Sequence, residues 1–174
     1  WLMLVSSVCV LILSAILLWP TWREYRKVRK LSADSMSHDH WVARGAIEDL
    51  TFMGPRASSA VPTLIRVMSE HPDSFTRFLA AESLGAIHSY PDIVIPSLTS
   101  ALRDENDDVR EGAAHALGLF GPLATSAVPE LVAALREHRI YDPDAECLRM
   151  IDPEVATSFL KSREHIDNGL VPKP

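Results

Sequence analysis

The stretch ALGLFGPLATSAVPELVAAL, residues 116–135, decides the fold of this chain. Apolar residues recur at helical spacing before Gly121-Pro122 and again after it. Gly121 suits the left-handed position that ends a helix, and the proline after it cannot continue one. Pro129 falls in the opening turn of the second segment, where the missing N–H of proline costs nothing. The stretch therefore predicts two amphipathic helices joined by a tight turn.

The same pattern occurs three times between Trp41 and His138. Its central leucines are Leu50, Leu84 and Leu117 in the first helices and Leu64, Leu98 and Leu131 in the second helices. Repetition every 33 or 34 residues indicates a solenoid, in which each unit buries its apolar face against the next. We expect these leucines to be buried, and we expect Gly85 and Gly118 to mark a close approach of neighbouring helices.

The pattern divides residues 41–165 into units at about 41–72, 73–105 and 106–139, followed by a degenerate unit at 140–165. The last unit keeps apolar residues at Leu148 and Ile151, and we expect it to cap the solenoid, because terminal repeats need a polar outer face. Ser59 and Ser126 stand just before second helices as candidate N-caps. Residues 166–174 are expected to form a tail.

Together with Asp108, Val109 and Arg110, the quoted stretch resembles a HEAT repeat of the short bacterial type, which includes the HEAT-like repeats of phycobilin lyases. The resemblance covers Trp41 to His138. It implies an all-α chain whose repeat domain is a short right-handed α-solenoid of helix pairs. It is specific for the fold and says little about function.

The resemblance also implies a contact between repeats. In the family, an arginine at the position of Arg77 and Arg110 often pairs with an aspartate of an adjacent repeat, and Asp73 or Asp107 is the implied partner. The first unit departs from this pattern, because an alanine occupies the arginine position and Arg44 follows one place later.

The first nineteen residues, Trp1 to Trp19, carry no charge. A helix of this length spans ~28 Å, close to the ~30 Å hydrocarbon core of a bilayer. Trp1, Trp19 and Trp22 stand at the ends of the stretch, where interfacial aromatic residues belong. A cleaved signal peptide is disfavoured, because residues 17–20 (LLWP) make a poor cleavage site. A buried core helix is also disfavoured, because the remaining chain is too short to surround it. We predict an N-terminal transmembrane helix at residues 1–19.

Residues 20–40 are predicted to form a basic juxtamembrane segment and, over residues 31–40, a polar link. Residues 20–30 of this segment contain one carboxylate, Glu24, and five cations: Arg23, Arg26, Lys27, Arg29 and Lys30. By the positive-inside rule they place the repeat domain in the cytoplasm. We expect residues to precede Trp1, and Arg or Lys among them would instead give an extracytoplasmic domain. The cations also attract anionic lipid, although a topology signal accounts for them as well.

The composition argues against several kinds of chemistry. Residues 31–174 carry a net charge of −10, the chain total of −6 less the +4 of residues 20–30, which disfavours nucleic-acid binding. We expect no cofactor, no metal site and no small-molecule substrate, because no further ligand set completes the pair His38 and His40 and no phosphate-binding or nucleophile motif occurs. Cys147 is expected to be a small core residue.

These features favour a single-pass protein of the cell membrane that acts without catalysis. We interpret it as a protein-binding scaffold, an accessory or assembly subunit of a larger membrane protein complex, with that complex and the lipid bilayer as partners. Ser7, Ser14 and Ala15 share one face of the predicted span, and small residues of this kind let transmembrane helices pack closely. The alternative, implied by the resemblance, is a lyase-like or bilin-handling enzyme.

Overall fold

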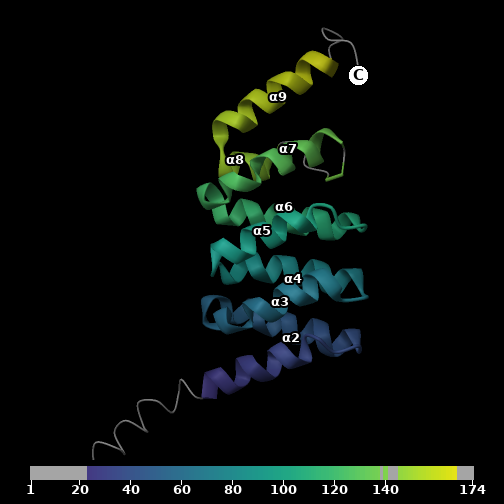
Figure 1. The fold of residues 1–174 in the computed structure, drawn as a ribbon, viewed down its shortest axis with the longest axis vertical. Helices are drawn as coiled ribbons and strands as arrows, with labels where there is room; N and C mark the ends of the chain where they lie inside the picture. Colours follow the sequence, from purple (N-terminus) through teal and green to yellow (C-terminus); the bar gives the residue numbers. More distant parts are fainter. Residues whose placement is uncertain (1–22, 138, 141–144, 168–174) are drawn as a thin grey trace, which may run out of the picture.

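The computed structural model describes residues 23–137, 139–140 and 145–167. All regular structure in these ranges is helical, and the helices stack in chain order along the long axis of the molecule (Figure 1). The N-terminal helical residues, in purple, lie at one end of the stack and α9 lies at the other. The transmembrane helix predicted at residues 1–19 lies outside the described residues.

The helix pairs expected from the sequence are present. They are α2 (His40–Met53) with α3 (Val61–Glu70), α4 (Ser74–Ile87) with α5 (Pro91–Ala101), and α6 (Asp107–Phe120) with α7 (Val128–Arg136). A short helix α8 (Glu146–Ile151) and a longer α9 (Pro153–Asp167) follow. Each first helix packs against the next one, α2 against α4, α4 against α6 and α6 against α8, and each second helix packs against the following first helix.

Gly54 and Gly121 end the first helices of units one and three with a φ of 55°. The connections differ from the predicted tight turn, because 3₁₀ helices fill them: η1 (Gly54–Ala60) and η2 (Gly121–Ala127). The prediction that Ser59 and Ser126 cap the second helices is wrong, since no side chain caps α3 or α7. Each 3₁₀ helix runs directly into the α-helix, so its carbonyls accept the N–H groups that a cap would otherwise satisfy.

Side-chain caps are found on the first helices instead. Asp39 accepts a hydrogen bond from the N–H of Trp41, Asp73 from that of Thr76, and Asn106 from that of Val109. These three residues stand 34 and 33 apart, so the cap is itself a repeated feature. Each cap satisfies one of the N–H groups that the first turn of a helix leaves without a partner.

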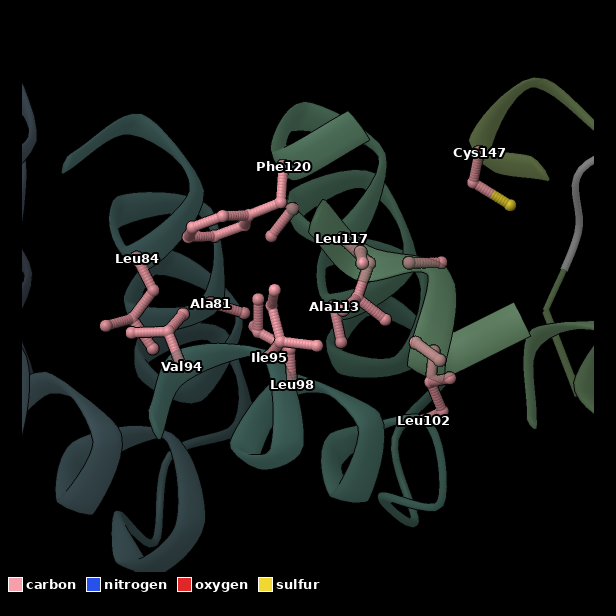
Figure 2. Packing of buried hydrophobic residues seen from close by; sticks show 14 of the residues in the cluster. Ala81, Leu84, Val94, Ile95, Leu98, Leu102, Ala113, Leu117, Phe120 and Cys147 are labelled. Carbon is pink, nitrogen blue, oxygen red and sulfur yellow. The ribbon is translucent and has the colours of Figure 1, made fainter. Parts of the chain in front are cut away.

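The core runs through the stack between the first and second helices. The six leucines at the centre of the repeat pattern are fully buried. Figure 2 shows Leu84, Leu98 and Leu117 packed together with Phe120. Backbones approach closely where side chains are small: a Cβ on Gly85 would lie 3.0 Å from the Cα of Ala116, so α4 and α6 can meet only because this residue is glycine.

The segment predicted as a polar link is part of the solenoid. Residues 23–34 are helical, and Val28, only 2% exposed, belongs to the core cluster. Leu31 packs against this core and Ser35 is fully buried. The spacing of Val28, Leu31 and Ser35 matches that of the second-helix stripe 33 residues later, so residues 23–34 form an additional layer in the second-helix position.

Within the described residues, one apolar stretch is long enough by composition to cross a membrane, Asp107–Arg136. It comprises α6, η2 and α7, and the chain leaves the α-helical conformation at Gly121. Since α6 packs against both α4 and α8, we assign this stretch to the third helix pair of the solenoid and not to a membrane span.

The degenerate fourth unit is helical over most of its described length. In α8, Cys147, Leu148 and Ile151 are buried, and α8 packs against α6, η2 and α7. Phe159 of α9 is buried against α8, and α9 extends to Asp167, two residues into the predicted tail. The rest of that tail lies outside the described residues.

The burial of the central leucines predicts a large effect of truncation. Leu117→Ala should lower the free energy of unfolding by ~2–5 kcal/mol, because a cavity remains in the core between the first and second helices. Glu137→Gln, at an exposed ion pair with Arg139, should change it by less than about 0.5 kcal/mol. Urea titration followed by circular dichroism measures both, and equal shifts would contradict the repeat register.

Candidate functional site

Arg77 is the most buried charged residue of the described chain and joins the first turn of α4 to the loop before α6. Its guanidinium, 7% exposed, donates from Nε and Nη2 to the carboxylate of Asp104 at 3.0 and 2.8 Å and from Nη1 to the carbonyl of His71 at 3.0 Å. It therefore pairs with an aspartate, but that aspartate stands at the end of its own predicted unit, 73–105, in the loop before α6, and not in an adjacent repeat as the family resemblance implied. The partner is Asp104 rather than Asp73 or Asp107, because Asp104 lies in the loop that the side chain reaches.

The first repeat makes the equivalent contact with a shifted arginine. Arg44 forms a bidentate ion pair with Asp73, its Nη2 lying 3.0 Å from each carboxylate oxygen, and its guanidinium lies 4.6 Å from the ring centre of Phe75. Arg44 thus compensates for the alanine in the arginine position of unit one. In unit three, Arg110 donates from Nη1 to the carbonyl of Asp104 at 2.8 Å and from Nε to the carbonyl of Arg139 at 2.5 Å.

A second set of ion pairs joins α7 to the segments that follow α5 and α7. Glu130 of α7 accepts from Arg103 at 2.7 Å and from Arg139 at 2.9 Å, and Arg139 also donates to the carbonyl of Leu102 at 3.0 Å. Arg103 and Glu130 are 27 residues apart, the same separation as Arg77 and Asp104. Opposite charges at this separation are a sequence signal that could have predicted these two contacts.

These contacts shift the titration of their carboxylates. Partial burial raises the pKa of Asp73, but hydrogen bonds from Thr76 and Arg44 outweigh it and lower the pKa to about 2. The hydrogen bond from Arg103, opposed by partial burial and reinforced by Arg139, lowers the pKa of Glu130 to about 2. Burial raises the pKa of Asp104, but the hydrogen bonds from Arg77 and from the N–H of Asn106, together with the charges of Arg77 and Arg110, outweigh it and leave the pKa lowered. These carboxylates and their arginine partners therefore hold neighbouring layers together.

The outer side of the first helices carries a row of exposed apolar side chains. Successive layers place Phe52, Ala86, Leu119 and Met150 in corresponding positions, and all are exposed. Phe52 is 95% exposed. Leu123 of η2, four residues after Leu119, is also exposed. We call Phe52, Ala86, Leu119 and Met150 the outer apolar row. Exposed apolar side chains gathered in this way mark interaction surfaces.

A polar row, acidic at two of its three positions, accompanies the apolar one. Glu48, Glu82 and His115 occupy corresponding positions of α2, α4 and α6, and the Nδ1 of His115 lies 2.8 Å from the carboxylate of Glu82. Each stands four residues before the member of the outer apolar row on its helix, so the two rows lie next to each other along the stack. The outer side of the solenoid therefore offers apolar contacts beside negative charge.

A pocket of about 250 Å³ lies between α6 and the last unit. It is lined by Glu111, Ala114, His115, Ile140, Glu146, Cys147 and Met150. Cys147 is 5% exposed and belongs to the core cluster, in the place expected for a small core residue. In the part of the chain that the structure describes, no group of three His, Cys, Asp or Glu side chains is arranged to hold a metal ion.

The predicted membrane residues divide into two groups. The cations of the juxtamembrane segment are exposed on the helical residues 23–34: Arg23, Arg26, Lys27, Arg29 and Lys30. Those in the span and at its interface lie outside the described residues: Trp1, Ser7, Ser14, Ala15, Trp19 and Trp22.

Helix pairs that stack in one direction and are joined by ion pairs between consecutive layers define an α-solenoid, a class that typically presents an extended surface for a protein partner. A family model described as HEAT repeats matches residues 30–118, and the chain belongs to this family. The match begins inside the helical residues 23–34, in agreement with their place in the stack. No curated protein matches the chain at significant similarity.

The burial of Arg77 predicts a strong effect of removing its partner. Asp104→Ala leaves the guanidinium buried with the carbonyls of His71 and Pro72 and the exposed carboxylate of Glu105 as neighbours, and should lower the free energy of unfolding by about 3 kcal/mol. Arg66→Ala, which breaks an exposed ion pair within α3, is the control and should change it by less than about 0.5 kcal/mol. Thermal and urea unfolding measure both, and a small effect of Asp104→Ala would contradict a structural role for the pair.

Acid should destabilise the fold through Asp73 and Glu130. Their pKa values are about 2 in the folded protein, against ordinary values of 3.8 and 4.5. A carboxylate with a lowered folded pKa contributes its full stability above the ordinary value and loses it as the pH falls towards the folded value. We expect the free energy of unfolding to fall between about pH 4.5 and about pH 2.

Asp73→Asn is a matched control for this prediction. The side-chain oxygen of the amide keeps the N-cap, as Asn106 does in α6, but the variant cannot lose a charge at this position. It should be less stable than the parent chain at pH 7 and should show a weaker dependence on acid. Urea titration at each pH is the measurement, and an unchanged dependence in the variant would show that Asp73 is not the group responsible.

Proposed function

We propose that this chain is a single-pass protein of the cell membrane whose HEAT repeats bind another protein, as an accessory or assembly subunit of a larger membrane complex. The outer apolar row carries the proposal. Phe52 is almost fully exposed, whereas the first-helix leucines and the arginines between layers are already used within the stack. Exposed apolar side chains at corresponding positions of successive layers suit a partner segment that lies along the stack.

The charge of the chain supports a partner with basic groups. Residues 31–174 have a net charge of −10, and Glu48 and Glu82 stand beside the outer apolar row. Complementary charge steers and orients protein association more than it adds affinity. The partner surface that fits best combines an apolar strip with Lys or Arg residues at its edge.

We propose binding rather than catalysis as the role of the repeats. A lyase-like role would require a site for a linear tetrapyrrole. The pocket between α6 and α8, at about 250 Å³, is smaller than the 300–1,000 Å³ usual for small-molecule sites, and a hollow of about 450 Å³ is lined by residues of α9 alone and encloses no ligand-shaped cavity. The lining of the pocket between α6 and α8 also includes buried core residues such as Cys147, which suits a packing gap at an irregular repeat.

The anchor is the second part of the proposal. The uncharged residues 1–19 are long enough to span the bilayer, and the cations that follow favour a cytoplasmic repeat domain. Ser7, Ser14 and Ala15 would let the span pack against a partner helix. Two contacts on one partner, joined by a short connection, reinforce each other through a high effective concentration.

Co-purification after gentle solubilisation tests the proposed function. The full-length chain should elute with a membrane complex, and Phe52→Asp with Leu119→Asp should reduce the recovered partner at least about tenfold, since fewer than a third of interface residues carry most of the affinity. Arg66→Asp with Arg136→Asp, on exposed second-helix positions, is the matched control and should keep the complex. Recovery of the monomer alone from native membranes would refute the proposal.

Membrane extraction tests the anchor separately. The full-length chain should remain in the membrane through 1 M salt and a carbonate wash, because screening of charges to ~3 Å does not release a buried span. A chain that begins at Arg23 should be released and should fold. One that begins at Leu31 removes Val28 from the core and should melt at a lower temperature. Release of the full-length protein by salt alone would contradict the span.

A further inference from the structure

We propose that the exposed side of the helical residues 23–34 is a lipid-binding surface, which contacts anionic phospholipid headgroups and sets the solenoid upright on the membrane. We call Arg23, Arg26, Lys27, Arg29 and Lys30 the basic end surface. The inference deepens the proposed function and rests on the proposed anchor, since it states how the repeats are presented once the chain is held at the bilayer.

The basic end surface faces away from the repeats. Val28, Leu31 and Ser35 lie on the side of this helix that contacts the core. At 100° per residue, Arg23, Arg26 and Lys30 lie on the opposite side, with Lys27 next to them. All five cations are exposed. Their charges therefore point out of the end of the stack, where a flat anionic surface can meet them together.

The cations are fixed relative to the solenoid, unlike those of a flexible polybasic tail. Val28 anchors the helix in the core, and the Nε2 of His71 lies 3.0 Å from the carbonyl of Ser37 just after it. At the other end, Glu24 lies 3.7 Å from Arg56 of η1, so the one carboxylate among the cations has its own partner. A surface bound through this helix therefore fixes the direction of the whole stack.

The rest of the chain has the opposite sign. Residues 31–174 carry a net charge of −10, so an anionic membrane repels the sides and the far end of the solenoid while it attracts the basic end surface. Because the layers stack in chain order, contact through the first layer directs the long axis away from the bilayer (Figure 1). The outer apolar row then runs away from the membrane and is open to a partner along its length.

Energy transfer from the protein to labelled headgroups tests the orientation. The full-length chain, with Cys9→Ser and Cys147→Ala, carries one dye at Ser69→Cys in α3 or at Thr157→Cys in α9, both exposed positions. It is reconstituted in nanodiscs of phosphatidylcholine alone or with phosphatidylserine. With phosphatidylserine, transfer should be higher at position 69 than at position 157. In 1 M salt, where screening shortens from ~10 to ~3 Å, this difference should be lost.

Charge reversal identifies the surface responsible. Arg26→Glu, Lys27→Glu and Lys30→Glu together should remove the difference between positions 69 and 157 in anionic discs. Arg66→Glu, Arg136→Glu and Lys161→Glu together make the same change in net charge on exposed positions elsewhere and should keep it. Melting temperatures of both variants show whether the fold is intact.

Two outcomes would overturn the proposal. Transfer that is the same in neutral and anionic discs would mean that the cations act only as a topology signal. Loss of the co-purified partner on reversal of the basic end surface, with transfer unchanged, would mean that it binds an acidic protein. The carbonate wash tests the anchor separately. If residues 1–19 do not span the bilayer, carbonate releases the chain. The basic end surface would then still bind anionic lipid in a salt-sensitive way.

Discussion

The close stacking of the first helices is the constraint on which the rest of this structure depends. The α4 and α6 backbones approach until a side chain on Gly85 would meet the Cα of Ala116, and Gly112 similarly leaves room for the ring of Phe78. With so little space between first helices, the large side chains pack on the inner side, against the second helices. The repeat of 33 or 34 residues follows, since the first helix of each unit must present small residues at the position where it meets the neighbouring first helix.

The same stacking determines how polar groups are used. Consecutive loops come close enough for an arginine of one first helix to reach a carboxylate in the loop before the next first helix, as Arg44 reaches Asp73 and Arg77 reaches Asp104. Asp73 then has two roles, because it caps α4 and receives Arg44. In unit three the cap is Asn106, and the ion pair moves to Asp104, two residues earlier. The contact between layers is maintained while its exact residues vary.

This variation explains what could be predicted from the sequence. The leucines recur in all three units and the Gly-Pro step in units one and three, so the helix pairs and their buried positions could be predicted from the period. The first layer could not, because its stripe has only two large apolar residues, Val28 and Leu31, among five cations that suggest a membrane boundary. The partner of Arg77 was also missed, since which of several nearby aspartates a loop presents depends on its backbone.

The candidate surfaces could not be predicted from the sequence either. Phe52 and Leu119 fit the helical spacing of their segments as outward positions, yet an isolated exposed residue means little. Only stacking places Phe52, Ala86, Leu119 and Met150 in one row, next to Glu48 and Glu82.

The division of surfaces in a short solenoid follows from its geometry. The inner stripes are buried by the neighbouring layers, the loops are joined by ion pairs, and among the described residues the two end layers have a neighbour on one side only. An end layer must therefore either be polar or be covered. The first layer meets this requirement with cations and the last with the polar residues of α9. A cationic end needs no apolar partner to be stable in water, yet it favours an anionic surface. For this reason the end can face lipid while the side of the stack remains free for a protein.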